Sequence, residues 1–253
     1  MIRTIIVILD FVFLAVISIV AYPVALLTGI FSKRKKDEYC LGFVKFSMKT
    51  LLFTAGTKVD YRGLENLPRK GQAAAYIGNH RGFFDVVAAY AVMPDLTGFI
   101  AKREMRRWPL IGWWMRTTHC LFMDRENRRE GLKTIIDGVN NLKSGISMVI
   151  YPEGTRSKEE GRMLEFHSGS FKLATKAKVP IIPIAANNSS AVFEDNKRIR
   201  RARIIIEFCE PVETADLSKE EIKQLPDRVR AILQKKITEN GKELGTLPED
   251  FEP

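Results

Sequence analysis

Residues 73–93 read AAAYIGNHRGFFDVVAAYAVM and hold two apolar segments joined by a polar turn. The run 73–77 has the length of a buried strand, and the run from Phe83 to Met93 has the length and composition of a helix. His80 and Asp85 stand five residues apart between them. A histidine at the end of a strand and an aspartate in the first turn of the next helix can share one loop. The stretch therefore predicts a strand–loop–helix unit that presents a histidine–carboxylate pair.

This pair suits general base catalysis. A carboxylate that accepts a hydrogen bond from one imidazole nitrogen leaves the other nitrogen free to take a proton from a hydroxyl. Pairs of His and Asp this close in sequence also arise by chance. The pair therefore indicates a catalytic site only if other motifs in the chain support the same function.

Short strands alternate with longer helices from residue 57 to residue 240, and residues 241–253 form a polar tail that we expect to fray. The alternation indicates an α/β fold with a mixed, largely parallel central sheet flanked by helices. Strands are predicted at 57–63, 73–77, 97–101, 120–124, 146–151, 181–185 and 203–209, and helices at 83–93, 131–142, 170–177 and 219–240.

Composition describes a globular protein with an anionic partner. The 253 residues are 45% apolar and 28% charged, which excludes a disordered chain, and the net charge is +10. Nucleic acid, anionic lipid headgroups or an acidic carrier with a phosphorylated substrate would all complement this charge. The three cysteines have no CxxC spacing. They argue against a disulfide framework or a structural zinc site and fit a reducing compartment.

The N-terminal segment indicates a membrane. Residues 5–31 are almost unbroken in apolar side chains, and this run exceeds the roughly 20 residues that cross a bilayer. Lys33, Arg34, Lys35 and Lys36 follow at once and should lie on the cytoplasmic side against anionic headgroups. A buried core helix is the alternative interpretation.

A second segment, residues 39–57, is apolar and aromatic but carries Lys45 and Lys49 on one helical face. This pattern is typical of an interfacial helix whose lysines point to headgroups. We expect residues 1–57 to form a membrane hairpin, or a single span with an interfacial helix, and residues 58–240 to form a domain on the cytoplasmic side of the cell membrane. The three tryptophans Trp108, Trp113 and Trp114 lie beside arginines and suit the membrane interface, with a core position as the alternative.

A second polar block, Tyr151-Pro152-Glu153-Gly154-Thr155-Arg156-Ser157, directly follows the strand at 146–150. Gly154 allows the backbone to approach a ligand, and Arg156 can grip a phosphate with two donors. An ordinary surface turn would also explain the Pro-Glu-Gly sequence.

The two polar blocks together resemble the glycerolipid acyltransferase family, the PlsC-like 1-acylglycerol-3-phosphate acyltransferases with an HX4D motif. Residues 120–125 (CLFMDR) and 179–185 (VPIIPIA) resemble two further blocks of that family, in the same order. The resemblance covers roughly residues 59–211. This chain has Arg81-Gly82 where other members often have Gln-Ser, and Tyr151 where Phe is common.

The resemblance implies a reaction and a site. His80, held by Asp85, would be the base for the free hydroxyl of 1-acyl-sn-glycerol-3-phosphate, which attacks an acyl-CoA or acyl carrier protein thioester and yields phosphatidic acid. No cofactor is implied, and three histidines without a ligand motif make a catalytic metal unexpected. The glycerol-phosphate contacts implied are Arg125, Glu153, Gly154, Thr155 and Arg156, with Lys102 as a further cation.

Other functions remain open at this point. Within the same class, the acceptor could be glycerol-3-phosphate or another lysolipid, such as a lyso-ornithine lipid. From other classes, the charge would suit a nucleic-acid-binding module, and the fold would suit an inactive lipid-binding protein. The sequence has no helix-turn-helix, RNP or zinc pattern, so nucleic acid is not an expected partner. The intact His80 and Asp85 argue against an inactive protein.

Overall fold

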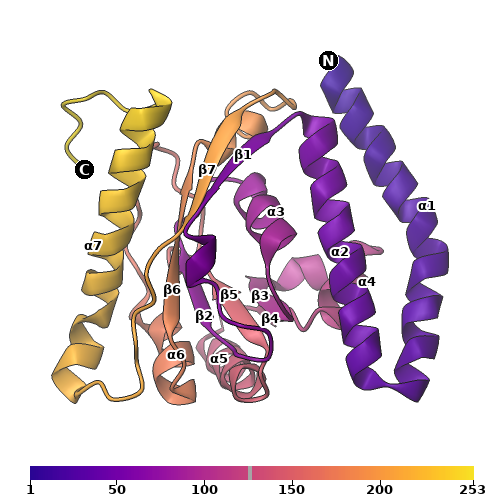
Figure 1. The fold of residues 1–253 in the computed structure, drawn as a ribbon, viewed down its shortest axis with the longest axis horizontal. Helices are drawn as coiled ribbons and strands as arrows, with labels where there is room; N and C mark the ends of the chain where they lie inside the picture. The colour runs from indigo at the N-terminus through magenta and orange to yellow at the C-terminus, as the bar shows by residue number, and fades with distance from the viewer. Residues whose placement is uncertain (125–126) are drawn as a thin grey trace.

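The computed structural model describes residues 1–124 and 127–253, and in these residues a seven-stranded sheet forms the centre of the molecule (Figure 1). The strand order is β1–β7–β6–β2–β5–β3–β4. Adjacent strands are parallel except for β6 and β7, which are antiparallel. The predicted mixed, largely parallel sheet is therefore confirmed. The strands are β1 (Lys58–Arg62), β2 (Ala75–Gly78), β3 (Thr97–Lys102), β4 (Leu121–Met123), β5 (Ser147–Ile150), β6 (Ile181–Asn187) and β7 (Arg203–Phe208).

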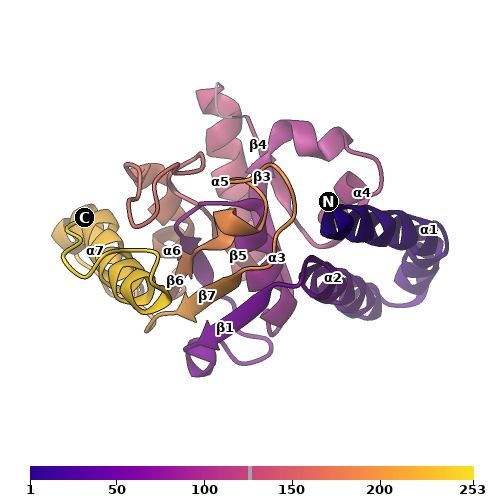
Figure 2. The ribbon, with the colours of Figure 1, turned by 90° about the horizontal axis from the view of Figure 1, so that it is seen from above.

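Helices cover both faces of this sheet (Figures 1 and 2). They are α1 (Ile2–Phe31), α2 (Lys33–Ala55), α3 (Phe83–Val92), α4 (Ile111–Thr117), α5 (Arg128–Lys143), α6 (Lys172–Ala177) and α7 (Lys219–Leu244), with short 3-10 turns η1 (Leu64–Asn66), η2 (Arg103–Arg107), η3 (Ser168–Phe171) and η4 (Ser189–Val192). The helix α7 runs past the predicted end at residue 240 and stops where Gly245 adopts a left-handed conformation. Leu247 beyond it is buried.

The two faces of the sheet bury two separate cores. Along β2, Ala75 and Ile77 pack in the core that includes residues of α6 and α7, whereas Tyr76 packs in the core that includes residues of α2 and α3. Successive side chains of a strand point to opposite faces. Because both faces of β2 are covered, the strand is continuously apolar instead of alternating.

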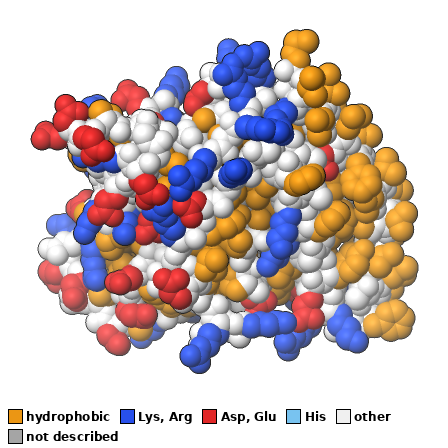
Figure 3. All heavy atoms as spheres, turned by 45° about the horizontal axis from the view of Figure 1, so that its top comes forward, with side chains coloured by type: hydrophobic (Ala, Val, Ile, Leu, Met, Phe, Trp, Pro, Cys, Tyr) orange, Lys and Arg blue, Asp and Glu red, His pale blue; other side chains and the backbone are white. Residues whose placement is uncertain are grey.

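The helices α1 and α2 form a hairpin beside α3 (Figure 1). Ser32 caps α2 by accepting a hydrogen bond from the Lys35 backbone N–H, so α2 begins at Lys33 rather than near residue 39. By length and composition, α1 can cross a membrane. Its outer face carries exposed Ile, Leu, Val and Phe side chains, visible as the apolar region at the right of Figure 3.

Two residues predicted at the membrane interface instead join the hairpin to the rest of the protein. Trp114 is buried, stacks on Phe43 with ring centroids 4.1 Å apart, and donates from Nε1 to Ser18 Oγ at 2.9 Å. Lys45 Nζ donates to the Met93 carbonyl oxygen at 2.7 Å, at the end of α3. Burial, with a smaller effect of nearby Lys49, lowers the pKa of Lys45. Trp114 therefore takes the core position that was its alternative, and the prediction that Lys45 points to headgroups is wrong.

Candidate active site

Two polar loops meet at one edge of the sheet because β2 and β5 are parallel neighbours, with Ile77 paired to Ile150. The carboxyl ends of parallel strands meet at the same edge, where open α/β sheets bind ligands. Residues 79–82 leave β2 there and residues 151–157 leave β5. The Ser157 N–H donates to the His80 carbonyl oxygen at 2.9 Å and joins the two loops. The two sequence blocks therefore form one site.

His80 and Asp85 form the predicted pair. Nδ1 of His80 lies 2.9 Å from Oδ2 of Asp85, whose side chain is 1% exposed. The same oxygen accepts hydrogen bonds from the backbone N–H groups of Arg81 (2.7 Å) and Gly82 (2.9 Å), which fix the carboxylate. An ionised carboxylate only accepts, so it favours the tautomer with the proton on Nδ1. Nε2 of His80 is then left as the proton acceptor.

Tyr151 holds the plane of the His80 ring. The two rings stack with centroids 4.4 Å apart and planes 19° apart. Burial, and secondarily the charge of Asp85, raises the pKa of Tyr151 well above its usual range, so the ring stays neutral. The imidazole is thus held by a hydrogen bond at its edge and by an aromatic ring on its face.

Glu153 lies beneath the site and supports its backbone. The side chain is buried; Oε1 accepts the His80 backbone N–H at 2.7 Å and Oε2 accepts the Leu164 N–H at 2.7 Å. Burial raises the pKa of Glu153, partly opposed by these two hydrogen bonds. Both oxygens are therefore engaged with the backbone, whereas the sequence predicted a contact of Glu153 with substrate.

We predict that Glu153→Gln will lower the free energy of unfolding by about 1–3 kcal/mol, because the amide group would turn an N–H toward a backbone N–H. The raised pKa means that the folded protein binds this proton at a higher pH than the unfolded chain does. The stability that Glu153 contributes should then decline as pH rises from about 4.5 through the folded-state pKa. Urea unfolding of both proteins across this range measures the difference, with exposed Glu159→Gln as control. Equal unfolding midpoints at every pH would contradict the supporting role.

The cations predicted to bind phosphate differ in their placement. Arg156 lies in the loop that leaves β5, and its side chain is 47% exposed. Its Nη1 lies 3.1 Å from Glu194 Oε1. Thr155 beside it is exposed, and Gly154 has a φ of 69° that favours glycine. Lys102 ends β3, is 61% exposed, and pairs with Glu104 at 3.4 Å. Arg125 lies outside the described residues.

Two charged residues of this edge have a role that sequence patterns did not reveal. Arg81 is buried, donates to the Ser157 carbonyl oxygen (2.8 Å) and to Ser190 Oγ (3.0 Å), and pairs with Glu160 at 3.1 Å. The only sequence feature that could have indicated this role of Arg81 is its position directly after His80. Glu194 accepts the Phe83 N–H at 2.7 Å from a position 111 residues away in the sequence, so no local pattern could indicate it.

The described residues hold no group of three or more His, Cys, Asp or Glu side chains arranged to bind a metal ion. What the site does offer is a histidine acceptor beside an exposed arginine, which suits proton removal from a hydroxyl of an anionic molecule.

Comparisons with known proteins agree with this geometry. A family model described as "Acyltransferase" matches residues 58–187. The 1-acyl-sn-glycerol-3-phosphate acyltransferase of Salmonella typhimurium strain LT2 is 34% identical over 190 residues, covering 75% of this chain and 76% of that protein. The protein of the same name from Escherichia coli K12 is 33% identical with the same coverage. The crystal structure of the 1-acyl-sn-glycerophosphate (LPA) acyltransferase PlsC from Thermotoga maritima aligns with a TM-score of 0.76 and 25% identity, covering 94% of this chain and 96% of that one.

Proposed function

This chain belongs to the acyltransferase family that includes the 1-acyl-sn-glycerol-3-phosphate acyltransferases, and on that premise we propose that it transfers a fatty acyl group from an acyl thioester to the free hydroxyl of 1-acyl-sn-glycerol-3-phosphate. The product is phosphatidic acid. The observation that carries the proposal is the His80–Asp85 hydrogen bond, which leaves Nε2 of His80 as an acceptor beside the loop that holds Arg156. The donor is acyl-CoA or an acyl carrier protein thioester.

In the proposed reaction, the acceptor hydroxyl gives its proton to Nε2 of His80 as its oxygen attacks the thioester carbonyl carbon. The imidazolium that forms is stabilised by the carboxylate of Asp85. Collapse of the tetrahedral intermediate breaks the C–S bond, and the departing thiol takes the proton from Nε2. The acceptor hydroxyl is itself the nucleophile, so the reaction needs no acyl-enzyme intermediate.

The acceptor phosphate is proposed to bind the exposed guanidinium of Arg156, next to Gly154 and Thr155. A guanidinium binds a phosphate with two parallel donors, which fixes its orientation as well as its position. Arg125 and Lys102 are assigned to the same phosphate from the resemblance in sequence. The end of β3 that carries Lys102 is separated from β2 by β5.

An acyl-transfer assay with a panel of acceptors tests the proposal. The purified protein is given each donor in turn, acyl-CoA or acyl carrier protein, with 1-acyl-sn-glycerol-3-phosphate, glycerol-3-phosphate or a lyso-ornithine lipid. We expect the highest kcat/KM with 1-acyl-sn-glycerol-3-phosphate. A preference for glycerol-3-phosphate or for the lyso-ornithine lipid would replace this acceptor with the alternative, and no transfer to any of them would reject the proposal.

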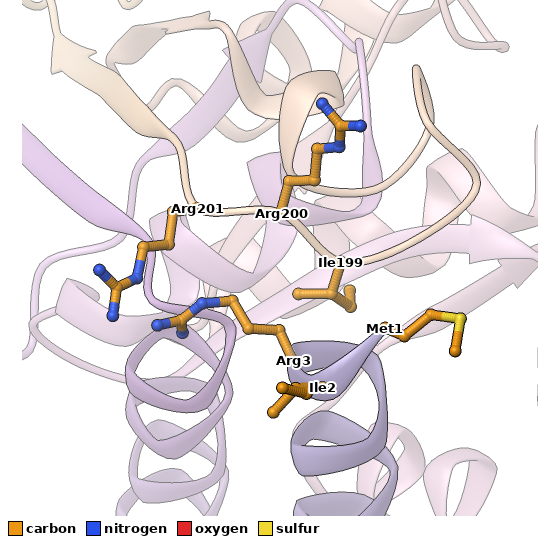
Figure 4. Close-up of a pocket in the computed structure, with 6 residues that line it drawn as sticks. All are labelled: Met1, Ile2, Arg3, Ile199, Arg200 and Arg201. Carbon is orange, nitrogen blue, oxygen red and sulfur yellow. The ribbon is translucent and has the colours of Figure 1, made fainter.

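We also propose that the protein acts on a phospholipid membrane, entered by α1 from the cytoplasmic side. The large exposed apolar face of α1 supports this, since such a face is costly in water. A cationic hollow borders the same helix (Figure 4): Arg3, Arg200 and Arg201 line it together with Met1, Ile2 and Ile199. Within the described residues, these three arginines take part in no ion pair with a carboxylate. Unpaired cations beside exposed apolar side chains match the boundary between phosphate headgroups and acyl chains.

Removing two of these arginines should weaken membrane binding selectively. At about 1 kcal/mol per arginine, Arg200→Ala combined with Arg201→Ala should lower partitioning onto anionic vesicles by about 30-fold. Flotation with phosphatidylcholine vesicles, with and without phosphatidylglycerol, measures this. The matched control is Lys219→Ala with Lys223→Ala on α7, across the sheet from α1 (Figure 1). Equal losses in both double variants would show that net charge alone, rather than this hollow, binds the headgroups.

A further inference from the structure

Glu194 joins two parts of the site although it lies beyond the residues that the family model matches. Its Oε1 accepts the backbone N–H of Phe83 at 2.7 Å and lies 3.1 Å from Nη1 of Arg156. Phe83 is the first residue of α3, the helix that carries Asp85. One carboxylate oxygen therefore contacts both the helix behind the proposed base and the guanidinium proposed to bind the acceptor phosphate.

The residue before α3 explains why this contact exists. The first N–H groups of a helix usually bond to a Ser, Thr, Asp or Asn side chain at the N-cap. Here the N-cap is Gly82, whose extended backbone (φ −158°) any residue can adopt. A Cβ added at Gly82 would lie 2.8 Å from Oε2 and 3.2 Å from Cδ of Glu194. The Glu194 carboxylate thus occupies the space of a capping side chain and accepts the N–H of Phe83, the first N–H of the helix, which has no partner within the helix.

The same carboxylate restricts Arg156. The guanidinium has five N–H donors, and Glu194 engages the group at Nη1 alone. Glu194 is 19% exposed and tied to the helix, so it is a fixed anchor, whereas Arg156 is about half exposed. Holding one end of a flexible side chain leaves its remaining donors oriented for a ligand at lower entropic cost.

We propose that Glu194 is a positioning residue with two separable tasks: it caps α3 in place of a side chain at residue 82, and it orients Arg156 toward the acceptor phosphate. The second task rests on the function proposed above. Loss of the cap should lower kcat, because α3 positions Asp85 and thereby His80. Loss of the contact with Arg156 should raise the KM for the phosphate-bearing acceptor.

Glu194→Gln separates the two tasks, because the amide oxygen can still accept the Phe83 N–H while the charge beside Arg156 is gone. We expect the KM for 1-acyl-sn-glycerol-3-phosphate to rise about 10-fold, with kcat close to that of the wild type. In an Arg156→Ala background, the same change should have no further effect on KM. Asp195→Asn, which removes one negative charge from the adjacent position, is the control. A lower KM, or an undiminished effect without Arg156, would overturn the orienting role.

The cap is tested by exchange with residue 82. Gly82→Ser alone should lower kcat and thermal stability, because its Cβ meets the Glu194 carboxylate. Combined with Glu194→Ala, which removes that carboxylate, the serine hydroxyl can accept another N–H of the first helical turn. The Cβ still lies 3.2 Å from the backbone N of Ser190, so kcat and stability should recover in part while the acceptor KM stays raised. Additive losses in the double variant would overturn the capping role. Thermal unfolding reports the cap even if the wild type fails to acylate 1-acyl-sn-glycerol-3-phosphate, so failure of the proposed function is seen separately.

Discussion

Replacing His80 by alanine should lower kcat by about 10²- to 10⁴-fold, the usual contribution of a positioned general base. The change removes the acceptor for the hydroxyl proton while Asp85 keeps two backbone N–H donors. The KM values for donor and acceptor should stay near those of the wild type, since His80 is assigned no role in binding either substrate. Single-turnover acyl transfer to 1-acyl-sn-glycerol-3-phosphate measures the loss directly.

The matched control is a histidine outside the site. His119 pairs with Asp37 at 3.2 Å and has a φ of 60°, a conformation that asparagine tolerates. His119→Asn should therefore keep the wild-type kcat. Substantial acyl transfer by a folded His80→Ala protein would remove His80 as the base.

Asp85→Asn should lower kcat by about 10²- to 10³-fold while leaving the fold intact. The amide oxygen of asparagine can still accept the N–H groups of Arg81 and Gly82, so the loop keeps its shape. The amide oxygen then also stays opposite Nδ1 of His80, but the neutral amide no longer stabilises an imidazolium on that ring. The loss is thus expected in kcat rather than in binding.

Asp85→Ala provides the comparison, because it also removes the acceptor for those backbone N–H groups. It should lower the thermal midpoint as well as kcat, whereas Asp85→Asn should change only kcat. Asp95→Asn alters a carboxylate that also accepts two backbone N–H groups, those of Gly71 and Leu96, away from this site. A wild-type rate in Asp85→Asn would show that the carboxylate charge has no part in the reaction.

The order of elements could be predicted from the sequence because each strand is a short apolar run that ends in a polar or glycine-bearing turn. Burial of β2 on both faces makes residues 73–77 continuously apolar, and the following helix is marked by its own apolar run. His80 and Asp85 could be found because they stand five residues apart, one in the loop after β2 and the other in the first turn of α3. The segments 79–85 and 151–157 could be predicted to lie in one site, because each follows a strand of a largely parallel sheet and both match blocks of the same family.

Contacts between distant segments escaped prediction for a physical reason. Glu153 and Arg156 are three residues apart on one turn, yet the first is buried beneath the backbone and the second is exposed. Sequence spacing does not reveal that difference, which depends on where His80 and Leu164 lie. Lys45 is a similar case, because only the packed structure places the end of α3 within reach of its ammonium group.

The attachment of the α1–α2 hairpin has a consequence for how the protein can be dissected. Leu51 and Leu52 of α2 belong to the same core as Tyr90 of α3, and Lys45 and Trp114 tie the hairpin to the remaining structure. A shortened chain starting at Lys58 would uncover this core, so solubility cannot be gained by trimming the apolar helices. The hairpin is also packed directly on the α/β domain and is not joined to it by a flexible linker. The depth that α1 reaches in a bilayer would therefore fix the distance of His80 from the bilayer surface.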